Sequence, residues 1–178
     1  MYFRNKILII LIMSFGLLNI ISAQNSNSNF GYSLLIGYPL GIFDLPGFGY
    51  HISSNLDYSF SKILSAESQI SYTKMDYNRS DNIFSHDGGL SSNLNFLIGL
   101  KLKFNNQHKK YHYYYNFLYG YGFGIDEFYN ANNEYFKERL STASISSSIN
   151  LIYNNKWNFS FVLESPNPTF LIRTGYKF

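Results

Sequence analysis

Apolar and polar residues alternate along most of the chain, which is the pattern of β-strands that present two different faces. The alternation is broken by clusters of Gly, Pro, Asn, Asp and Ser, residues that favour turns. An even number of such strands can close into an up-and-down barrel with both chain ends on one side. We predict eight antiparallel strands, over residues 30–40, 47–59, 63–74, 90–104, 110–126, 141–154, 157–164 and 169–178.

One parity of each predicted strand carries large apolar side chains, and the other carries small or polar ones. Tyr or Phe occupies every second position from Tyr111 to Phe123, whereas Asn116, Gly120 and Gly122 lie on the other parity. An eight-stranded barrel has interior room for little more than one layer of side chains, so these rings cannot all point inward. We therefore predict a transmembrane barrel with its apolar parity toward lipid. The alternative is a soluble barrel with an apolar interior.

Charged residues within the predicted strands follow the polar parity, which supports the same orientation. A Lys or Arg turned toward lipid at mid-membrane costs about 2–4 kcal/mol. Lys74 falls on the apolar parity, at a strand end from which its ammonium group can reach the membrane surface. We predict a packed charge network in the lumen, with a small pore or transporter as the alternative. Its members are Asp57, Glu67, Asp126, Glu164, Lys101, Lys103, Arg173 and Lys177.

The first 23 residues are typical of a secretory signal peptide. Arg4 and Lys6 precede an apolar run from Ile7 to Ile21, and Ala23 is a small residue suited to cleavage. As a helix this run would span about 22 Å, which is less than the ~30 Å hydrocarbon core of a membrane. We expect residues 1–23 to be cleaved on export, 24–29 to form a short linker and 30–178 to form the barrel domain.

The composition narrows the classes of function. The 178-residue chain is 20% aromatic and 14% charged, and it contains no cysteine, so disulfides, thiolate metal sites and Cys nucleophiles are excluded. Arg4 and Lys6 supply two of the positive charges in a formal net charge of only +3, so nucleic acid is not an expected partner. No spacing of His, Asp or Glu indicates a specific metal site, and we expect no cofactor.

The last predicted strand ends in Tyr176 and Phe178. With the signal peptide and eight alternating strands, this ending makes the chain resemble the small OmpA/OmpX-type β-barrels of the bacterial outer membrane. The resemblance implies a monomeric Gram-negative cell-envelope protein surrounded by outer-membrane lipid and lipopolysaccharide. It also implies insertion by the outer-membrane assembly machinery, which recognises a C-terminal aromatic strand, here through Tyr176 and Phe178. Gly175 departs from the usual position of the glycine in that signal.

The predicted connections alternate between short turns and longer polar segments, as the two ends of such barrels do. Ser61-Lys62 and Asn155-Lys156 are short, whereas Met75–Gly89 and Glu127–Leu140 are long and polar. Loops on a rigid scaffold often carry function. We therefore predict a non-enzymatic structural or surface-binding role, in which the loops 75–89 and 127–140 contact an extracellular protein or glycan.

One segment carries residue types that could support acyl transfer. His51 and Ser53 match the His-x-Ser step of the PagL-type lipid A deacylases, and Glu67 on the next strand could supply the carboxylate of a triad. Ser54 then departs from that family's pattern. The predicted parity also turns all three candidates into the lumen, away from lipid. A lipid A-modifying hydrolase is therefore the alternative function.

A cluster of hydrogen bonds inside the lumen explains the same residues without catalysis, because buried polar groups need partners. With a turn near Ser61, we expect Asn55 to lie opposite Glu67 and Ser53 opposite Gln69.

Overall fold

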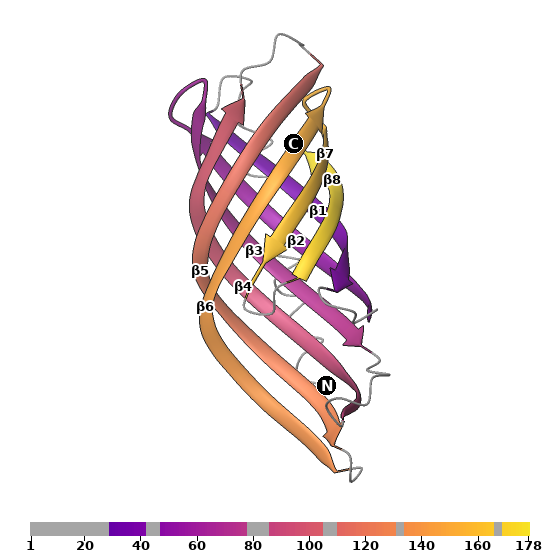
Figure 1. Cartoon of the computed structure of the whole chain (residues 1–178). Helices are drawn as coiled ribbons and strands as arrows, with labels where there is room; N and C mark the ends of the chain where they lie inside the picture. Colours follow the sequence, from indigo (N-terminus) through magenta and orange to yellow (C-terminus); the bar gives the residue numbers. More distant parts are fainter. Residues whose placement is uncertain (1–28, 42–46, 78–85, 105–109, 131–133, 166–168) are drawn as a thin grey trace.

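The computed structural model describes residues 29–41, 47–77, 86–104, 110–130, 134–165 and 169–178. Eight strands form one closed antiparallel barrel in which each strand pairs with its neighbour in sequence and β8 pairs with β1 (Figure 1). The prediction of an all-β, eight-stranded antiparallel barrel is confirmed. The strands are β1 Phe30–Gly41, β2 Gly47–Ser59, β3 Leu64–Tyr77, β4 His86–Phe104, β5 Tyr111–Asn130, β6 Tyr135–Tyr153, β7 Trp157–Glu164 and β8 Thr169–Lys177.

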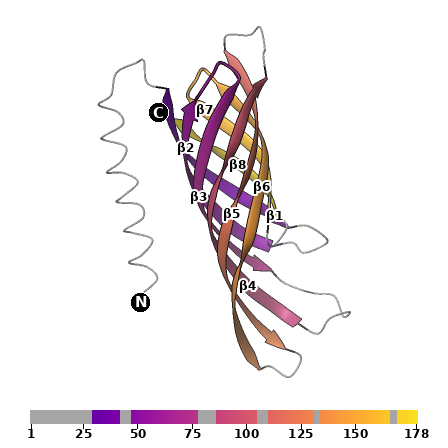
Figure 2. The same cartoon turned by 90° about the vertical axis from the view of Figure 1, so that its left-hand side faces the viewer.

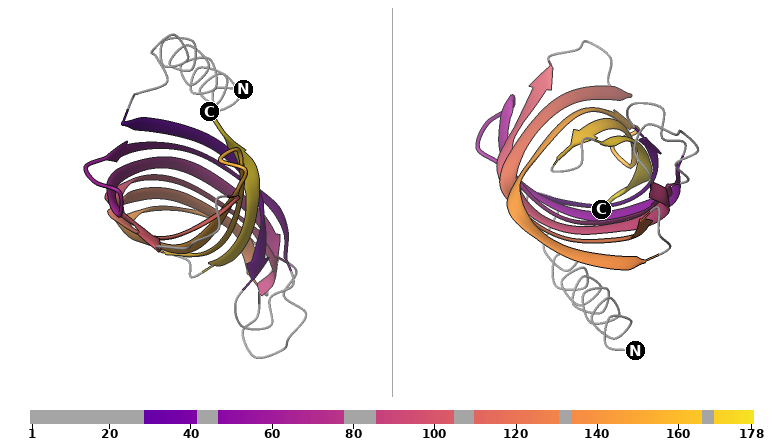
Figure 3. Two further views of the ribbon diagram at one scale, coloured as in Figure 1. Left: turned by 90° about the horizontal axis from the view of Figure 1, so that it is seen from above. Right: turned by 60° about the horizontal axis from the view of Figure 1, so that its bottom comes forward.

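The barrel closes where the last strand meets the first. The register between β1 and β8 runs from Ser33 opposite Lys177 to Gly41 opposite Thr169. Beyond it, the N–H of Phe178 donates a hydrogen bond to the C=O of Tyr32 at 2.8 Å. Closure pairs backbone groups that an open sheet would leave exposed, and the resulting ring is visible along the barrel in Figure 3.

The two faces of the wall differ as the alternation predicts. Exposure alternates strictly along β7, where Phe161 on the outer face is 68% exposed and its neighbour Val162 on the inner face is buried. Large exposed side chains on the outside are mainly Ile, Leu, Phe and Tyr, and the buried interior is mainly Ser, Asn, Thr and charged residues. The predicted orientation is confirmed. This arrangement is stable in lipid and would expose an extensive apolar surface in water.

Several interior positions are occupied by glycine because the neighbouring strand approaches too closely for a side chain. A Cβ at Gly120 would overlap the carbonyl oxygen of Phe96, and a Cβ at Gly175 would overlap that of Leu34. Gly175 therefore lets β8 lie directly against β1 where the barrel closes.

The strands differ greatly in length, so the wall is higher on one side. β4, β5 and β6 contain 19, 20 and 19 residues, whereas β7 and β8 contain 8 and 9. Figures 1 and 2 show the tip of the β5–β6 pair well beyond the ends of β7 and β8, at the end of the barrel opposite the C-terminus. We call the paired strand ends 125–130 and 134–139 the protruding hairpin.

The predicted loop Glu127–Leu140 is largely strand, and this prediction is wrong. The predicted loop Met75–Gly89 is strand at both ends, and its residues 78–85 lie outside the described part of the chain. β3 continues to Tyr77 and β4 begins at His86, while β5 and β6 remain paired out to Tyr129 opposite Tyr135. Their polar sequences lack a two-residue period because both faces are polar there, yet the backbone pairing continues. The other predicted strand ends differ from the observed ones by at most one residue.

Residues 1–28 lie outside the described part of the chain, so the predicted signal peptide and nearly all of the linker are not addressed by the structure. Among the described residues, no helix is long and apolar enough to cross a membrane.

Candidate functional site

The interior contains a group of two acids and two bases, which we call the central charge cluster. Lys101 on β4 places its Nζ 3.3 Å from Asp57 Oδ1 and 3.2 Å from Glu67 Oε2. Lys177 on β8 places its Nζ 3.4 Å from Asp57 Oδ2. The side chains of Lys101, Asp57 and Glu67 are 5%, 4% and 1% exposed, so water screens these contacts little. The cluster is neutral overall.

The strand register assembles this cluster from residues far apart in sequence. Asp57 lies opposite Glu67 across β2 and β3, and Lys101 lies two residues beyond the partner of Glu67 on β4, on the same inner face. Glu67 Oε1 accepts hydrogen bonds from Asn55 Nδ2 at 2.7 Å and Asn116 Nδ2 at 2.8 Å. The cluster therefore links β2, β3, β4, β5 and β8 across the lumen, with its central carboxylate hydrogen-bonded.

Arg173 forms a second polar contact across the lumen. It starts on β8, crosses β1 over Gly37 and reaches two further strands, where its Nη1 donates to Ser53 Oγ at 3.3 Å and to Gln69 Oε1 at 3.0 Å. A Cβ at Gly37 would lie 2.8 Å from Arg173 Cγ, so the glycine leaves room for this crossing. Arg173 is only 1% exposed. It fills the lumen and does not line an aqueous path.

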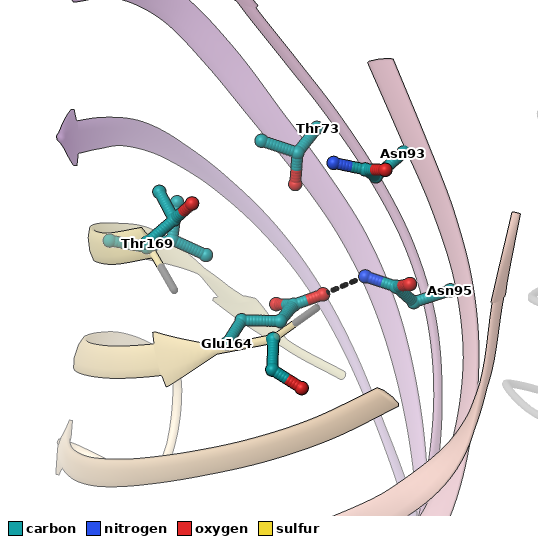
Figure 4. Close-up of a pocket in the computed structure, with 7 residues that line it drawn as sticks. Thr73, Asn93, Asn95, Glu164 and Thr169 are labelled. Carbon is teal, nitrogen blue, oxygen red and sulfur yellow. Dashed lines mark hydrogen bonds between the residues drawn. The ribbon is translucent and has the colours of Figure 1, made fainter. Parts of the chain in front are cut away.

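Glu164 lies at the end of the lumen that adjoins the low side of the wall. Its Oε1 accepts hydrogen bonds from Ser71 Oγ at 2.9 Å and from Asn95 Nδ2. Figure 4 shows this carboxylate beside a small cavity of about 10 Å³, which is room for roughly one water molecule. Its lining residues are Thr73, Asn93, Asn95, Glu164, Ser165, Thr169 and Leu171. The cavity is too small for an organic ligand.

The two remaining members of the predicted network lie away from the central charge cluster. Lys103 lies opposite Tyr114, toward the short-turn end of the barrel. Asp126 lies opposite Ser91 and Glu138, at the base of the protruding hairpin. The structure thus joins Asp57, Glu67, Lys101 and Lys177 through direct ion pairs. Arg173 is linked to this group through Gln69 and Asn55, which also donates to Glu67. Among the described residues, no three His, Asp or Glu side chains are arranged to hold a metal ion.

The acyl-transfer candidates make contacts with other partners. His51 Nδ1 lies 2.8 Å from Thr73 Oγ1, Ser53 accepts from Arg173, and Glu67 accepts from two asparagines. All three candidates are buried in the lumen, at no more than 1% exposure. A nucleophile and its base need a shared hydrogen bond, whereas His51, Ser53 and Glu67 each bond to a different partner. These contacts belong to the packed interior of the barrel.

The expected register of this region is wrong by two residues. Asn55 lies opposite Gln69, Ser53 lies opposite Ser71, and Glu67 is opposite Asp57. The cause is a longer turn than Ser61-Lys62, because β2 ends at Ser59 and the N–H groups of residues 60 and 61 both donate to the C=O of Leu64. The turn therefore occupies residues 60–63 and shifts the pairing.

The C-terminal aromatic residues pack together on the outer wall. The centre of the Tyr176 ring lies 5.6 Å from that of Trp157 and 5.0 Å from that of Phe178. The ring centres of Phe178 and Tyr32 are 5.9 Å apart. These rings cover the junction between the first and last strands. Their role as an assembly signal stays a prediction.

The protruding hairpin carries the charged groups that a partner outside the membrane could reach. Lys137 on β6 lies opposite Glu127 on β5, and its Nζ forms an ion pair with Glu127 Oε1. This hydrogen bond from Lys137 lowers the pKa of Glu127 below its usual value. Tyr135 and Phe136 beside the tip are 53% and 43% exposed.

The sequence interpretation placed this region in a loop and so missed that β5 and β6 continue through it. One signal could have indicated that β6 extends beyond its neighbour: β7 is short and is followed in sequence by Pro166 and Pro168, which end a strand.

A closed barrel with an apolar exterior and a polar, packed interior defines the class of small transmembrane β-barrels. Solved structures with this fold include Ail, the attachment invasion locus protein of Yersinia pestis. A crystal structure of Ail matches with a TM-score of 0.53 and 13% identity, over 85% of this chain and 97% of that chain. A second Ail structure, in complex with the heparin analogue sucrose octasulfate, matches with a TM-score of 0.52 and 12% identity over the same shares.

The N-terminal β-barrel domain of Pseudomonas aeruginosa OprF gives a TM-score of 0.45 and 10% identity, over 85% of this chain and 98% of that domain. No family model matches the chain, and no curated protein sequence matches it. At these identities the likeness to Ail shows the fold, which is that of the small outer-membrane barrels, as the sequence resemblance implied.

Proposed function

We propose that the protein is a non-enzymatic surface-binding protein of the bacterial outer membrane. The barrel is its membrane anchor, and the protruding hairpin contacts a partner outside the cell. The observation that carries this proposal is the unequal wall, in which β5 and β6 continue past the ends of β7 and β8 (Figure 2). Extra strand length beyond the lipid adds no membrane anchorage, and it provides a stiff, solvent-exposed surface.

The lumen supports the same proposal because it offers a poor setting for transport or catalysis. Arg173 and the central charge cluster cross it, and the cavity beside Glu164 holds roughly one water molecule. A pore needs a continuous aqueous path, and a lipid-modifying enzyme needs its nucleophile at the lipid-facing wall. Ser53 is buried on the inner face.

At the end of the barrel that carries the protruding hairpin, the charges favour a protein over a sulfated glycan as the partner. Ail was solved with a heparin analogue, so a sulfated glycan is a natural candidate ligand. In this chain, however, residues 74–90 and 125–140 contain seven acidic and four basic residues. A surface with excess negative charge repels a polysulfate.

The barrel itself would have two further partners. The lipid and lipopolysaccharide of the outer membrane would surround the apolar band, and the assembly machinery would bind the strand that ends in Tyr176 and Phe178.

A loop replacement tests the proposal. Gly124 lies opposite Leu140, so replacing residues 125–139 with Asn-Gly should close β5 and β6 with a tight turn. Cells displaying the full chain should adhere to immobilised basement-membrane extract and not to heparin, and the shortened variant should lose that adhesion. Both should run as heat-modifiable barrels on gels. As a matched control, Asn155→Gly at the opposite end should adhere normally, because this residue has a positive φ of 59° that glycine accepts. Equal adhesion by the shortened variant would overturn the proposal.

A further inference from the structure

The end of the barrel with the short turns is strongly basic. Its turns and the adjoining strand ends contain five lysines and neither Asp nor Glu, over residues 58–66, 102–104, 110–115, 150–160 and 174–178. The opposite end, by contrast, carries more acidic than basic residues. Short turns mark the periplasmic end of outer-membrane barrels. The excess positive charge therefore lies on the side of the periplasmic leaflet of the membrane.

Backbone hydrogen bonds between neighbouring strand ends hold these lysines around a single rim. One bond joins the end of β4 to the turn between β2 and β3. Two others join the start of β5, the turn between β6 and β7, and the end of β8. The bonds are Lys103 N–H to Ile63 C=O at 2.8 Å, Asn154 N–H to Lys110 C=O at 2.8 Å and Lys177 N–H to Lys156 C=O at 2.6 Å. The positive charges are thus fixed by the wall of the barrel.

Three of the five lysines are free to contact a partner outside the barrel. Lys103 and Lys177 lie on the inner face, where Lys177 belongs to the central charge cluster. Each of the three turns carries one further lysine, and all three side chains are exposed. None of them forms an ion pair with another residue in the described part of the chain. We call Lys62, Lys110 and Lys156 the basic rim.

Each lysine of the basic rim is followed directly by an exposed apolar or aromatic side chain. These neighbours are Ile63, Tyr111 and Trp157. Tyr and Trp on the outer wall of a membrane protein settle at the level of the lipid headgroups. A lysine beside such a ring can lay its apolar stem along the wall and keep its ammonium group in the headgroup layer. The basic rim is therefore at the level of the lipid phosphates.

We infer that the basic rim binds the phosphate groups of anionic phospholipids in the periplasmic leaflet. This inference goes beyond the proposed function, because it concerns the end of the barrel opposite the protruding hairpin. An ammonium group binds phosphate as a compact point charge. One lysine close to an anionic membrane surface contributes about a fivefold preference, equivalent to ~1 kcal/mol. The protein should therefore gather phosphatidylglycerol around its periplasmic end.

An acidic polymer of the periplasm, such as the peptidoglycan of the cell wall, fits the basic rim less well. Such a polymer approaches the mouth of the barrel along its axis. Of the two lysines on the inner face there, Lys177 is already paired with Asp57. The exposed lysines instead stand beside side chains of the outer wall, where lipid lies. The position of the charges thus favours the membrane over the cell wall as the partner.

The fluorescence of Trp157 provides the test, because it is the one tryptophan of the chain and directly follows Lys156. The protein is placed in phosphatidylcholine vesicles that contain a lipid with a nitroxide quencher near its headgroup. The quencher is carried either by phosphatidylglycerol or by phosphatidylcholine. Quenching titrations should give about a fivefold preference for phosphatidylglycerol beside Trp157. The preference should approach one at an ionic strength of ~1 M, where the Debye length is only about 3 Å.

Four variants identify the groups responsible. Lys156→Gln should bring the preference close to one, and Lys156→Arg should retain it because the charge remains. Lys74→Gln removes the same charge at the opposite end of the barrel and should leave the preference unchanged. The double variant Trp157→Phe/Tyr111→Trp moves the reporter beside Lys110, where adding Lys110→Gln should abolish the preference again. Lys110 and Lys156 are exposed, so their variants should fold, which the heat-dependent shift on gels verifies.

Two results would overturn the inference. One is a wild-type protein that shows no preference between the two quenchers. The other is a preference that persists in Lys156→Gln, which would assign it to groups other than the basic rim. If the wild type has no preference but sediments with peptidoglycan, and Lys156→Gln weakens that sedimentation, the cell wall is the partner and the inference fails. Without phosphatidylglycerol, the basic rim should contribute nothing to the stability of the barrel.

Discussion

Lys101→Met should destabilise the barrel strongly, because Lys101 neutralises two buried carboxylates. Its Nζ lies 3.3 Å from Asp57 and 3.2 Å from Glu67, and its side chain is 5% exposed. The ammonium group also lies 4.9 Å from the centre of the Tyr114 ring. Methionine retains an unbranched apolar chain and removes the charge. The variant therefore leaves a net negative charge in an interior that screens it poorly.

The size of this loss follows from the contacts that remain. Removing one partner of a buried ion pair costs about 3–5 kcal/mol. Here Lys177 still lies 3.4 Å from Asp57, and Asn55 and Asn116 still donate to Glu67. Because these contacts remain, we expect the free energy of unfolding to fall by ~3 kcal/mol, the lower end of that range. Adding Glu67→Gln restores neutrality, so the double variant should be more stable than the sum of the two single losses allows.

The assay is urea unfolding of the protein in lipid vesicles, followed by the fluorescence of Trp157, the one tryptophan of the chain. Lys62→Met is the matched control, because Lys62 is exposed in the turn between β2 and β3, and it should change stability by less than ~0.5 kcal/mol. A Lys101→Met variant within ~1 kcal/mol of wild type, or strictly additive effects in the double variant, would refute the role given to the central charge cluster.

Three further outcomes are expected. Gly175→Ala should lower stability by about 1–3 kcal/mol, seen as unfolding at a lower temperature on gels, because its Cβ would overlap the Leu34 carbonyl oxygen; Thr174→Ala, which faces outward, should not. Ser53→Ala should leave the acyl pattern of lipid A unchanged by mass spectrometry, and loss of a deacylated species would revive the hydrolase interpretation. The pKa of Glu127 is lowered in the folded protein, so its stabilisation of the hairpin is fully present above the usual pKa and is lost as the pH falls through the lowered one. Amide exchange at the tip should accelerate over that range, and Glu127→Gln should remove the pH dependence.

The closed part of the barrel could be predicted because lipid and lumen impose opposite chemistry on neighbouring residues. In β7, outward Phe159 and Phe161 alternate with inward Ser160 and Val162, and any other register would place a polar group in lipid. The same constraint allowed the sequence to predict that Asp57 and Lys101 point into the lumen. Their mutual contact could not be read, because it depends on a register fixed by the four-residue turn at 60–63.

The sequence was less informative where one chemistry covers both faces. Glu127–Leu140 is polar on each parity, so nothing in its pattern distinguishes a strand from a loop, and only the observed pairing of β5 with β6 does so. Single apolar residues on the inner parity are a related case. Leu118 and Leu171 are each 1% exposed and fill space between the polar clusters, a role that alternation alone does not assign.

β6 pairs with none of the described strands on one side from Lys137 to Ala143, and this marks where the membrane must end on that side of the barrel. Lipid offers no partner for backbone N–H and C=O groups, so hydrocarbon cannot contact an unpaired strand edge. The last pair between β6 and β7 is Ser146 opposite Glu164, and the bonds from Ile145 to Ser165 extend the pairing by one residue. The apolar band must therefore stop at about this level, with outward Ile149, 60% exposed, inside it and Arg139 outside it. The shortness of β7 thus sets both the height of the membrane anchor on this side and the point from which β6 continues into the protruding hairpin.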